Sequence, residues 1–179
     1  MLPSHADDIR DFQIEGMSIG DSLLNYFSKD QIKNAPRYDH TNTNAKSDKF
    51  YEARFKKIGN YEEVLFSLKK NDQSFIIYSI QGVEKYENNI SDCYKKIKTI
   101  ADELKSLFKD IKKKEGKFPH KADKTGKSII KYINYEFKSG DSVSIQCYDW
   151  TKKMGYWDNL RISILSKEFL YWTYYEQYN

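Results

Sequence analysis

The two cysteines constrain the fold of this chain more than any other feature, because both lie on apolar faces of expected elements. Between residues 89 and 112 apolar side chains recur every three or four residues, which is the period of one helix face. They are Ile90, Cys93, Ile97, Ile100, Leu104, Leu107 and Ile111. Further along, Val143, Ile145 and Cys147 alternate with polar residues, as in a strand with one buried face. A helix over about 89–112 that covers this sheet would bring the two thiols together.

This arrangement predicts a disulfide bond between Cys93 and Cys147. Such bonds persist in oxidising compartments, so the prediction goes with export. The alternative is two unrelated buried thiols, since cysteine is a common small core residue. A metal site is not expected, because no further cysteine or histidine lies at the short spacing that zinc ligands need.

The first six residues indicate the same compartment. Ser4-His5-Ala6 has small residues at the two positions that a signal peptidase reads, and Pro3 lies just before them. We therefore expect residues 1–6 to be the remainder of a signal peptide, removed from a periplasmic or secreted protein, and residues 7–179 to form a single domain. The alternative is an ordinary disordered tail. No stretch of the sequence approaches the ~20 apolar residues of a membrane span.

The composition suits one aromatic-rich domain and argues against a nucleic-acid partner. Of the 179 residues 16% are aromatic, which supplies a sizeable core. The formal charge is only +4 and comes mainly from lysine, a residue that a low-GC bacterial genome favours. The basic cluster from Lys109 through Lys127 contains no arginine. We interpret it as a solvated helix end, which the helix dipole favours, and not as a nucleic-acid footprint.

Alternating apolar residues between turn signals predict six strands in two groups of three. The expected ranges are 50–57, 61–70, 75–83, 128–138, 142–150 and 159–165. Two short helices are expected within 18–34, the second opened by a capping box at Ser28. The predicted fold class is α+β: one antiparallel sheet of about six strands, packed by one long helix over about 89–112 and by short N-terminal helices. The segment 167–178 fits either a helix or a final strand.

One short motif invites an enzymatic interpretation. Gly20-Asp21-Ser22-Leu23 resembles the nucleophile block of the GDSL esterases, in which a buried strand precedes the block and a late Asp-x-x-His supplies the base. This chain has neither feature, and its last histidine is His120. A serine hydroxyl without a base is not a competent nucleophile. We therefore expect Ser22 to begin a helix.

Two further patterns carry no chemistry on their own. Gly126-Lys127-Ser128 resembles the end of a phosphate-binding loop, but Lys121 stands where the first glycine belongs, and a strand follows instead of a helix. His120 and Asp123 would give zinc two ligands, whereas it takes three or four. The sequence therefore predicts no catalytic residue, no metal and no cofactor.

Aromatic residues late in the chain form the candidate ligand site. Tyr148, Trp150, Trp157 and Trp172 could line a groove for a sugar or a peptide, because their rings combine apolar faces with a polar group. The alternative is that these rings belong to the core and the sheet surface.

Several segments resemble uncharacterised small exported proteins of marine alphaproteobacteria. These segments are residues 14–24, Ile80-Gln81-Gly82, the helix with Cys93 and Cys147-Tyr148-Asp149-Trp150. The resemblance implies export and a regular fold but no activity. The Gly16-Met17-Ser18 opening before a strand meander is also similar to outer-membrane assembly lipoproteins of the SmpA type and to modules of β-lactamase inhibitory proteins. That similarity implies a sheet surface that binds protein.

We therefore expect an exported, non-enzymatic domain that binds another envelope protein or a ligand, without a membrane span and without nucleic acid. The alternative is a hydrolytic enzyme whose acidic site is hidden among the 26 aspartate and glutamate residues.

Overall fold

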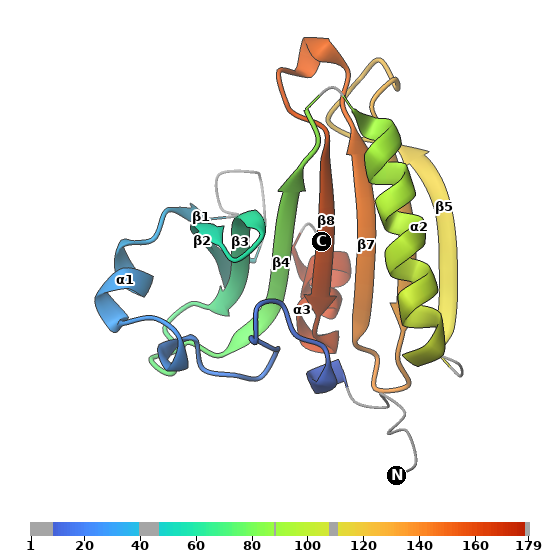
Figure 1. The fold of residues 1–179 in the computed structure, drawn as a ribbon. Coiled ribbons are helices and arrows are strands. Elements are labelled where there is room, and N and C mark those ends of the chain that lie inside the picture. The colour runs from blue at the N-terminus through green and yellow to red at the C-terminus, as the bar shows by residue number, and fades with distance from the viewer. Residues whose placement is uncertain (1–8, 40–46, 88, 108–110, 178–179) are drawn as a thin grey trace.

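The structure, a computed structural model, describes residues 9–39, 47–87, 89–107 and 111–177. Within these residues the centre is one antiparallel sheet of eight strands in the order β1-β2-β3-β4-β8-β7-β6-β5 (Figure 1). The strands are β1 (Arg37–Asp39), β2 (Phe50–Ile58), β3 (Tyr61–Lys69), β4 (Ile77–Lys85), β5 (Lys112–Pro119), β6 (Ile129–Glu136), β7 (Ser142–Asp149) and β8 (Asn159–Leu165). Two four-stranded meanders thus join where β4 pairs with β8.

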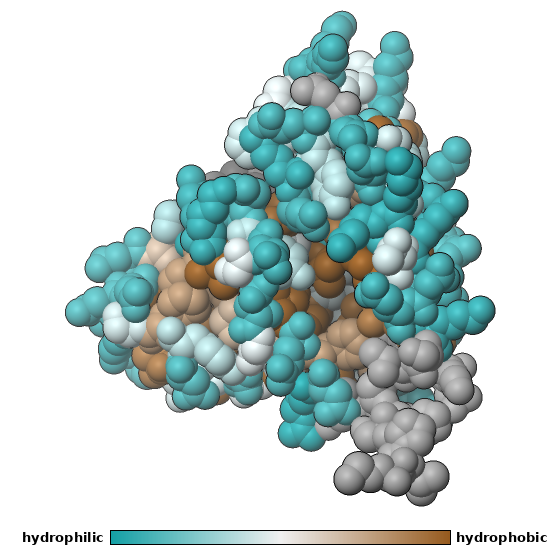
Figure 2. Space-filling model, viewed as in Figure 1, coloured by the Kyte–Doolittle hydropathy of each residue, from teal (hydrophilic) through white to brown (hydrophobic). Residues whose placement is uncertain are grey.

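The helical elements cover both faces of this sheet. They are η1 (Ile9–Asp11), η2 (Leu23–Asn25), α1 (Lys29–Asn34), α2 (Ile90–Leu107), η4 (Lys152–Met154), α3 (Lys167–Tyr171) and the π-helical turn η5 (Trp172–Glu176). Figure 1 shows α2 in front of β7, whereas α3 lies behind β8. Figure 2 shows that the outer side of α2 is hydrophilic and that apolar side chains appear mainly in the crevices between elements.

The core lies between the sheet and its front layer of α2 and the N-terminal segment. Val143, Ile145 and Cys147 alternate onto the front face of β7 and are buried, as are Cys93 and Ile97 of α2. Over β2 and β3 the N-terminal segment supplies the cover, where the ring of Phe27 stacks on that of Phe55 at 4.2 Å and Leu23 and Ile32 are buried. One continuous apolar cluster results.

The disulfide prediction is confirmed. Cys93 and Cys147 are bonded, with their Cα atoms 6.0 Å apart and both side chains fully buried. The bond fastens the first turns of α2 to the middle of the second meander. None of the described helices combines the length and the apolar character that a membrane crossing requires.

The predicted fold class is wrong. The protein is mainly an eight-stranded sheet, with 41% of residues in strands and 26% in helices, and no single long helix packs against a six-stranded sheet. The expected helix over 89–112 ends by Leu107, and residues 112–119 form the edge strand β5. The error has a physical cause: β5 is solvent-exposed along its whole length, so it lacks the apolar alternation that reveals a strand. Part of the basic cluster therefore lies on β5, where Lys112 and Lys114 pair with Glu136.

Predictions of where helices begin were more reliable than the predicted number of strands. Ser28 opens α1 with the expected capping box, in which its side chain and that of Gln31 satisfy each other's backbone N–H groups. Ser22 caps η2 as expected, and its Oγ donates to the Ser74 carbonyl at 2.6 Å. The segment after Ser166 is helical. Residues 1–6 lie outside the described part of the chain, so the signal-peptide remnant stays a prediction.

Candidate functional site

Two loops meet at one end of the sheet and build the candidate site. The first, residues 120–128, connects β5 to β6, and the second, residues 150–158, connects β7 to β8. Both lie at the upper end of the sheet in Figure 1. Together with the last residues of β7 they gather five ring-bearing side chains: His120, Tyr148, Trp150, Tyr156 and Trp157. We call this group the aromatic end.

Trp150 is the centre of the aromatic end. Its ring centroid lies 4.3 Å from that of His120, 4.8 Å from that of Tyr156 and 6.0 Å from that of Tyr148. The Arg161 guanidinium lies 4.2 Å from the centroid of the Tyr148 ring and so extends the stack onto β8. These contacts join His120, Tyr148, Trp150 and Tyr156 in one packed group, which Trp157 borders at the pocket.

Asp123 joins the two loops beneath the rings. The residue is 5% exposed, and its carboxylate accepts hydrogen bonds from the backbone N–H and hydroxyl groups of both Ser128 and Thr125. Thr151 of the second loop donates its N–H to Ser128 Oγ at 3.0 Å and its hydroxyl to Asp123 at 3.2 Å. Hydrogen bonds from the Ser128 hydroxyl, then from Thr125, hold the pKa of Asp123 far below its usual range. The loops are therefore preorganised around a buried charge.

His120 contributes a partly buried ring to the aromatic end. Its Nδ1 accepts the Ala122 N–H at 3.1 Å. Burial, followed by the nearby positive charge of Arg161, lowers the pKa of His120 from 6.5. His120 and Asp123 do not form a zinc site, since the Asp123 carboxylate accepts hydrogen bonds from Thr125 and Ser128. Across the described residues no group of three His, Cys, Asp or Glu side chains could hold a metal.

A pocket of about 570 Å³ opens beside Trp150. Its walls are Glu87, Trp150, Lys152, Tyr156, Trp157 and Asp158. Trp157 and Tyr156 are 63% and 60% exposed, although both have large apolar rings. Trp150 Nε1 is buried and has no hydrogen-bond partner among the described residues. A buried donor without a partner is costly.

Asp158 is the most perturbed acid of the pocket. Burial raises its pKa, and the nearby charge of Asp149 adds to that effect. The backbone N–H of Trp150 donates to Asp158 Oδ1 at 2.8 Å, which fixes the carboxylate at the pocket wall. Glu87 is ion-paired with Lys85, and the Lys85 ammonium lies 3.6 Å from the centroid of the Trp157 ring. The pocket thus combines two carboxylates, one ammonium and three aromatic rings.

The structure brings three of the four expected ligand-binding residues together and separates the fourth. Tyr148, Trp150 and Trp157 belong to the aromatic end, but Trp172 of η5 is fully buried away from it. There its Nε1 donates to Ser47 Oγ at 2.8 Å and its ring packs on Phe50. Trp172 therefore belongs to the core, in line with the alternative considered for these residues.

Sequence reasoning missed the organising role of Asp123 and the part played by Tyr156 and Glu87. The Asp123-Lys124-Thr125 spacing carried a usable signal, because aspartate often accepts the N–H two residues later in a turn. Gly155 was a second usable signal, since a glycine with a φ of +68° ends η4 directly before Tyr156 and Trp157. Ser128, the last residue of the pattern like a phosphate-binding loop, is committed to Asp123.

Comparisons with protein-family models, with curated proteins and with solved structures found no match to this chain. The resemblances to exported bacterial proteins therefore stay predictions, and any function has to be inferred from geometry and chemistry.

Proposed function

We propose that this chain is an exported binding protein whose aromatic end takes a neutral saccharide. The observation that carries the proposal is the exposure of Trp157 and Tyr156 around a pocket that also holds Asp158 and Glu87. Single exposed rings are common on protein surfaces, but aromatic rings and convergent polar groups in one concavity are typical of ligand sites.

The lining matches the chemistry of a pyranose ring. An equatorially substituted sugar presents a flat C–H face, which packs on an indole or phenol ring, and a rim of hydroxyl groups. Asp158 and Glu87 can accept from those hydroxyls, and Lys152 can donate to them. Because Lys85 occupies one face of Trp157, the sugar would stack on the other face.

The size of the pocket favours a small ligand over an envelope protein. Its volume of about 570 Å³ falls within the range of roughly 300–1,000 Å³ that is usual for small-molecule sites. The rigid loops also favour binding, because a preorganised site does not lose affinity to the ordering of its own residues.

The Cys93–Cys147 disulfide supports the exported location, periplasmic or secreted. A bond of this kind persists where the surroundings are oxidising and is rare in the reducing cytosol of most organisms.

An enzyme is the alternative, and Asp158 is the observation that favours it. A carboxyl group with a raised pKa near a second carboxylate is one half of a glycosidase acid–base pair. Glu87, the other acid of this pocket, is ion-paired with Lys85 and well solvated, which suits a hydrogen-bond acceptor better than a tuned acid.

Isothermal titration of the full chain with cellotetraose and with tetra-N-acetylchitotetraose tests the proposal. We expect saturable binding of at least one, weakened about tenfold by Trp157→Ala, which corresponds to about 1.4 kcal/mol. Tyr171→Ala is the matched control, since Tyr171 is also an exposed ring but lies on α3. Absence of binding to both sugars, or an equal loss in the control, would refute the proposal. Shorter sugars released during the titration would favour the enzyme.

A further inference from the structure

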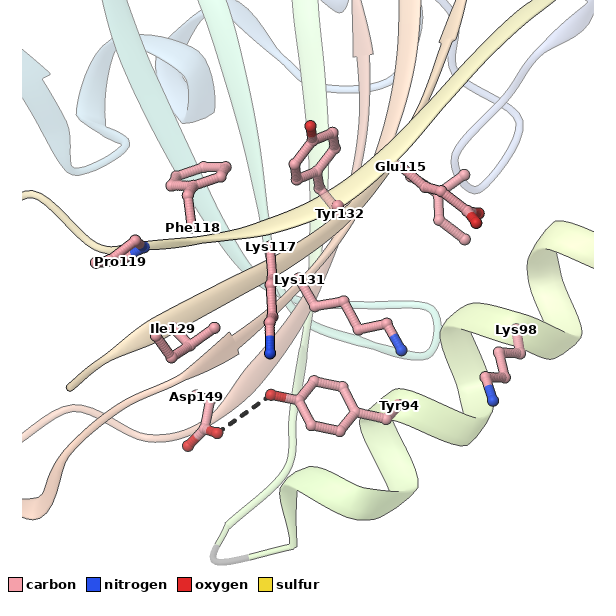
Figure 3. A pocket seen from close by; sticks show the side chains of 12 residues that line it. Tyr94, Lys98, Glu115, Lys117, Phe118, Pro119, Ile129, Lys131, Tyr132 and Asp149 are labelled. Carbon is pink, nitrogen blue, oxygen red and sulfur yellow. Dashed lines mark hydrogen bonds between the residues drawn. The ribbon is translucent and has the colours of Figure 1, made fainter. Parts of the chain in front are cut away.

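A second and larger pocket lies between α2 and the β5–β6 edge of the sheet (Figure 3). Its volume is about 890 Å³. Tyr94 and Lys98 enter it from α2, one helical turn apart, and Lys117, Lys131 and Ile129 face them from the sheet. This pocket shares no wall residue with the one at the aromatic end.

Three lysines converge on this pocket, which two carboxylates also line. Lys117 of β5 and Lys131 of β6 are direct cross-strand neighbours, and Figure 3 shows both side chains extending toward Tyr94. Like charges placed directly opposite each other destabilise a sheet. No ion pair of Lys98, Lys117 or Lys131 is present among the described residues. The pocket therefore carries three ammonium groups against two carboxylates.

Each of the two acids that line the pocket has a partner other than these three lysines. Asp149 accepts the Tyr94 hydroxyl at 3.1 Å, the hydrogen bond drawn in Figure 3. Glu115 forms an ion pair of 2.7 Å with Lys113. Three ammonium groups against two carboxylates leave the lining one positive charge in excess, which favours an anion.

Apolar side chains line the pocket between these charged groups. Ile129 and Ile133 flank Lys131 on the same face of β6, and Ile133 is buried. The Tyr94 ring lies 5.1 Å from the Lys131 ammonium and forms part of the helix-side wall. Cys147 pairs with Lys131 in the sheet register, and its disulfide to Cys93, the neighbour of Tyr94, fixes that wall to the sheet.

We propose that this pocket binds a small amphiphilic anion, with a carboxylate or phosphate head at Lys98, Lys117 and Lys131 and an apolar chain against Ile129, Ile133 and Tyr94. A head group alone would leave the apolar wall in contact with water, and a neutral chain would leave the excess positive charge uncompensated. The proposal is independent of saccharide binding at the aromatic end.

The test is isothermal titration of the full chain with dodecanoate below its critical micelle concentration, with dodecanol and inorganic phosphate as separate arms. We expect dodecanoate to bind saturably and at least about tenfold more tightly than either of the other two. Lys117→Gln/Lys131→Gln should weaken dodecanoate binding about tenfold or more, and 0.5 M salt should weaken it as well.

The charge-matched control is Lys33→Gln/Lys96→Gln, which removes two exposed lysines that do not line the pocket and should leave dodecanoate binding unchanged. Trp157→Ala should also leave it unchanged, which separates this site from the saccharide site. Absence of saturable dodecanoate binding, inorganic phosphate binding as tight as dodecanoate binding, or equal losses in the pocket and control variants would overturn the proposal.

Discussion

The disulfide is predicted to supply a large share of the stability of this domain. Cys93 and Cys147 are 54 residues apart in sequence, and the chain-entropy relation credits closure of a loop of that length with about 4 kcal/mol. Typical domains have a net stability of about 5–15 kcal/mol. In a chain of this size each kcal/mol moves the melting temperature by about 2–4 °C, so loss of the bond should lower it by about 8–16 °C.

The assay is thermal unfolding followed by circular dichroism, for the oxidised protein and for Cys93→Ala/Cys147→Ala. Alanine avoids the added cost of burying two hydroxyl groups at positions that are fully buried. Reductant should lower the melting temperature of the parent toward that of the double variant and leave the variant unchanged. A difference below about 3 °C between parent and variant would refute the reasoning, because the loop-closure contribution would then be absent.

Three further predictions concern the loops and the N-terminal segment. Asp123→Asn should lower the melting temperature and shift tryptophan emission to the red, because the loop that carries Trp150 loses its charged anchor; unchanged emission would contradict that role. The pKa of His120 is lowered by burial and by Arg161, so its contribution to stability is complete above pH 6.5 and is lost as the pH falls below that value toward the lowered pKa. His120→Gln should therefore flatten the fall in urea midpoint between pH 7 and pH 5, and an unchanged slope would contradict it. Ser22→Ala should cost at most about 1 kcal/mol in urea unfolding, and a fluorophosphonate probe should not label Ser22; stoichiometric labelling would restore the esterase interpretation.

Sequence patterns within a few neighbouring residues were sufficient to predict part of this structure. Cys93 and Cys147 could be paired from two local periodicities, because each cysteine had to lie on the buried side of its own element. The Ser28 capping box depends on a spacing of three residues and needs no tertiary information.

The remaining features depend on contacts between distant residues. β5 is stabilised by its ladder with β6, and nothing in its own exposed side chains distinguishes it from a loop. Trp172 and Trp157 have the same side chain, yet one is enclosed by Phe50 and Phe169 and the other borders solvent, a difference that only packing decides. The lysine pocket joins α2 to β5 and β6, so it could not be recognised before these elements were placed.

The central claim, saccharide binding at the aromatic end, is tested most directly by the three tryptophan indole N–H signals in a ¹H–¹⁵N NMR titration with the tetrasaccharides. Trp150 and Trp157 line the pocket, whereas Trp172 is fully buried against Phe50, outside the pocket lining, and serves as an internal control. The account predicts saturable shifts of the Trp150 and Trp157 indole signals and an unchanged Trp172 signal. Static signals throughout, or three equal shifts, would contradict it.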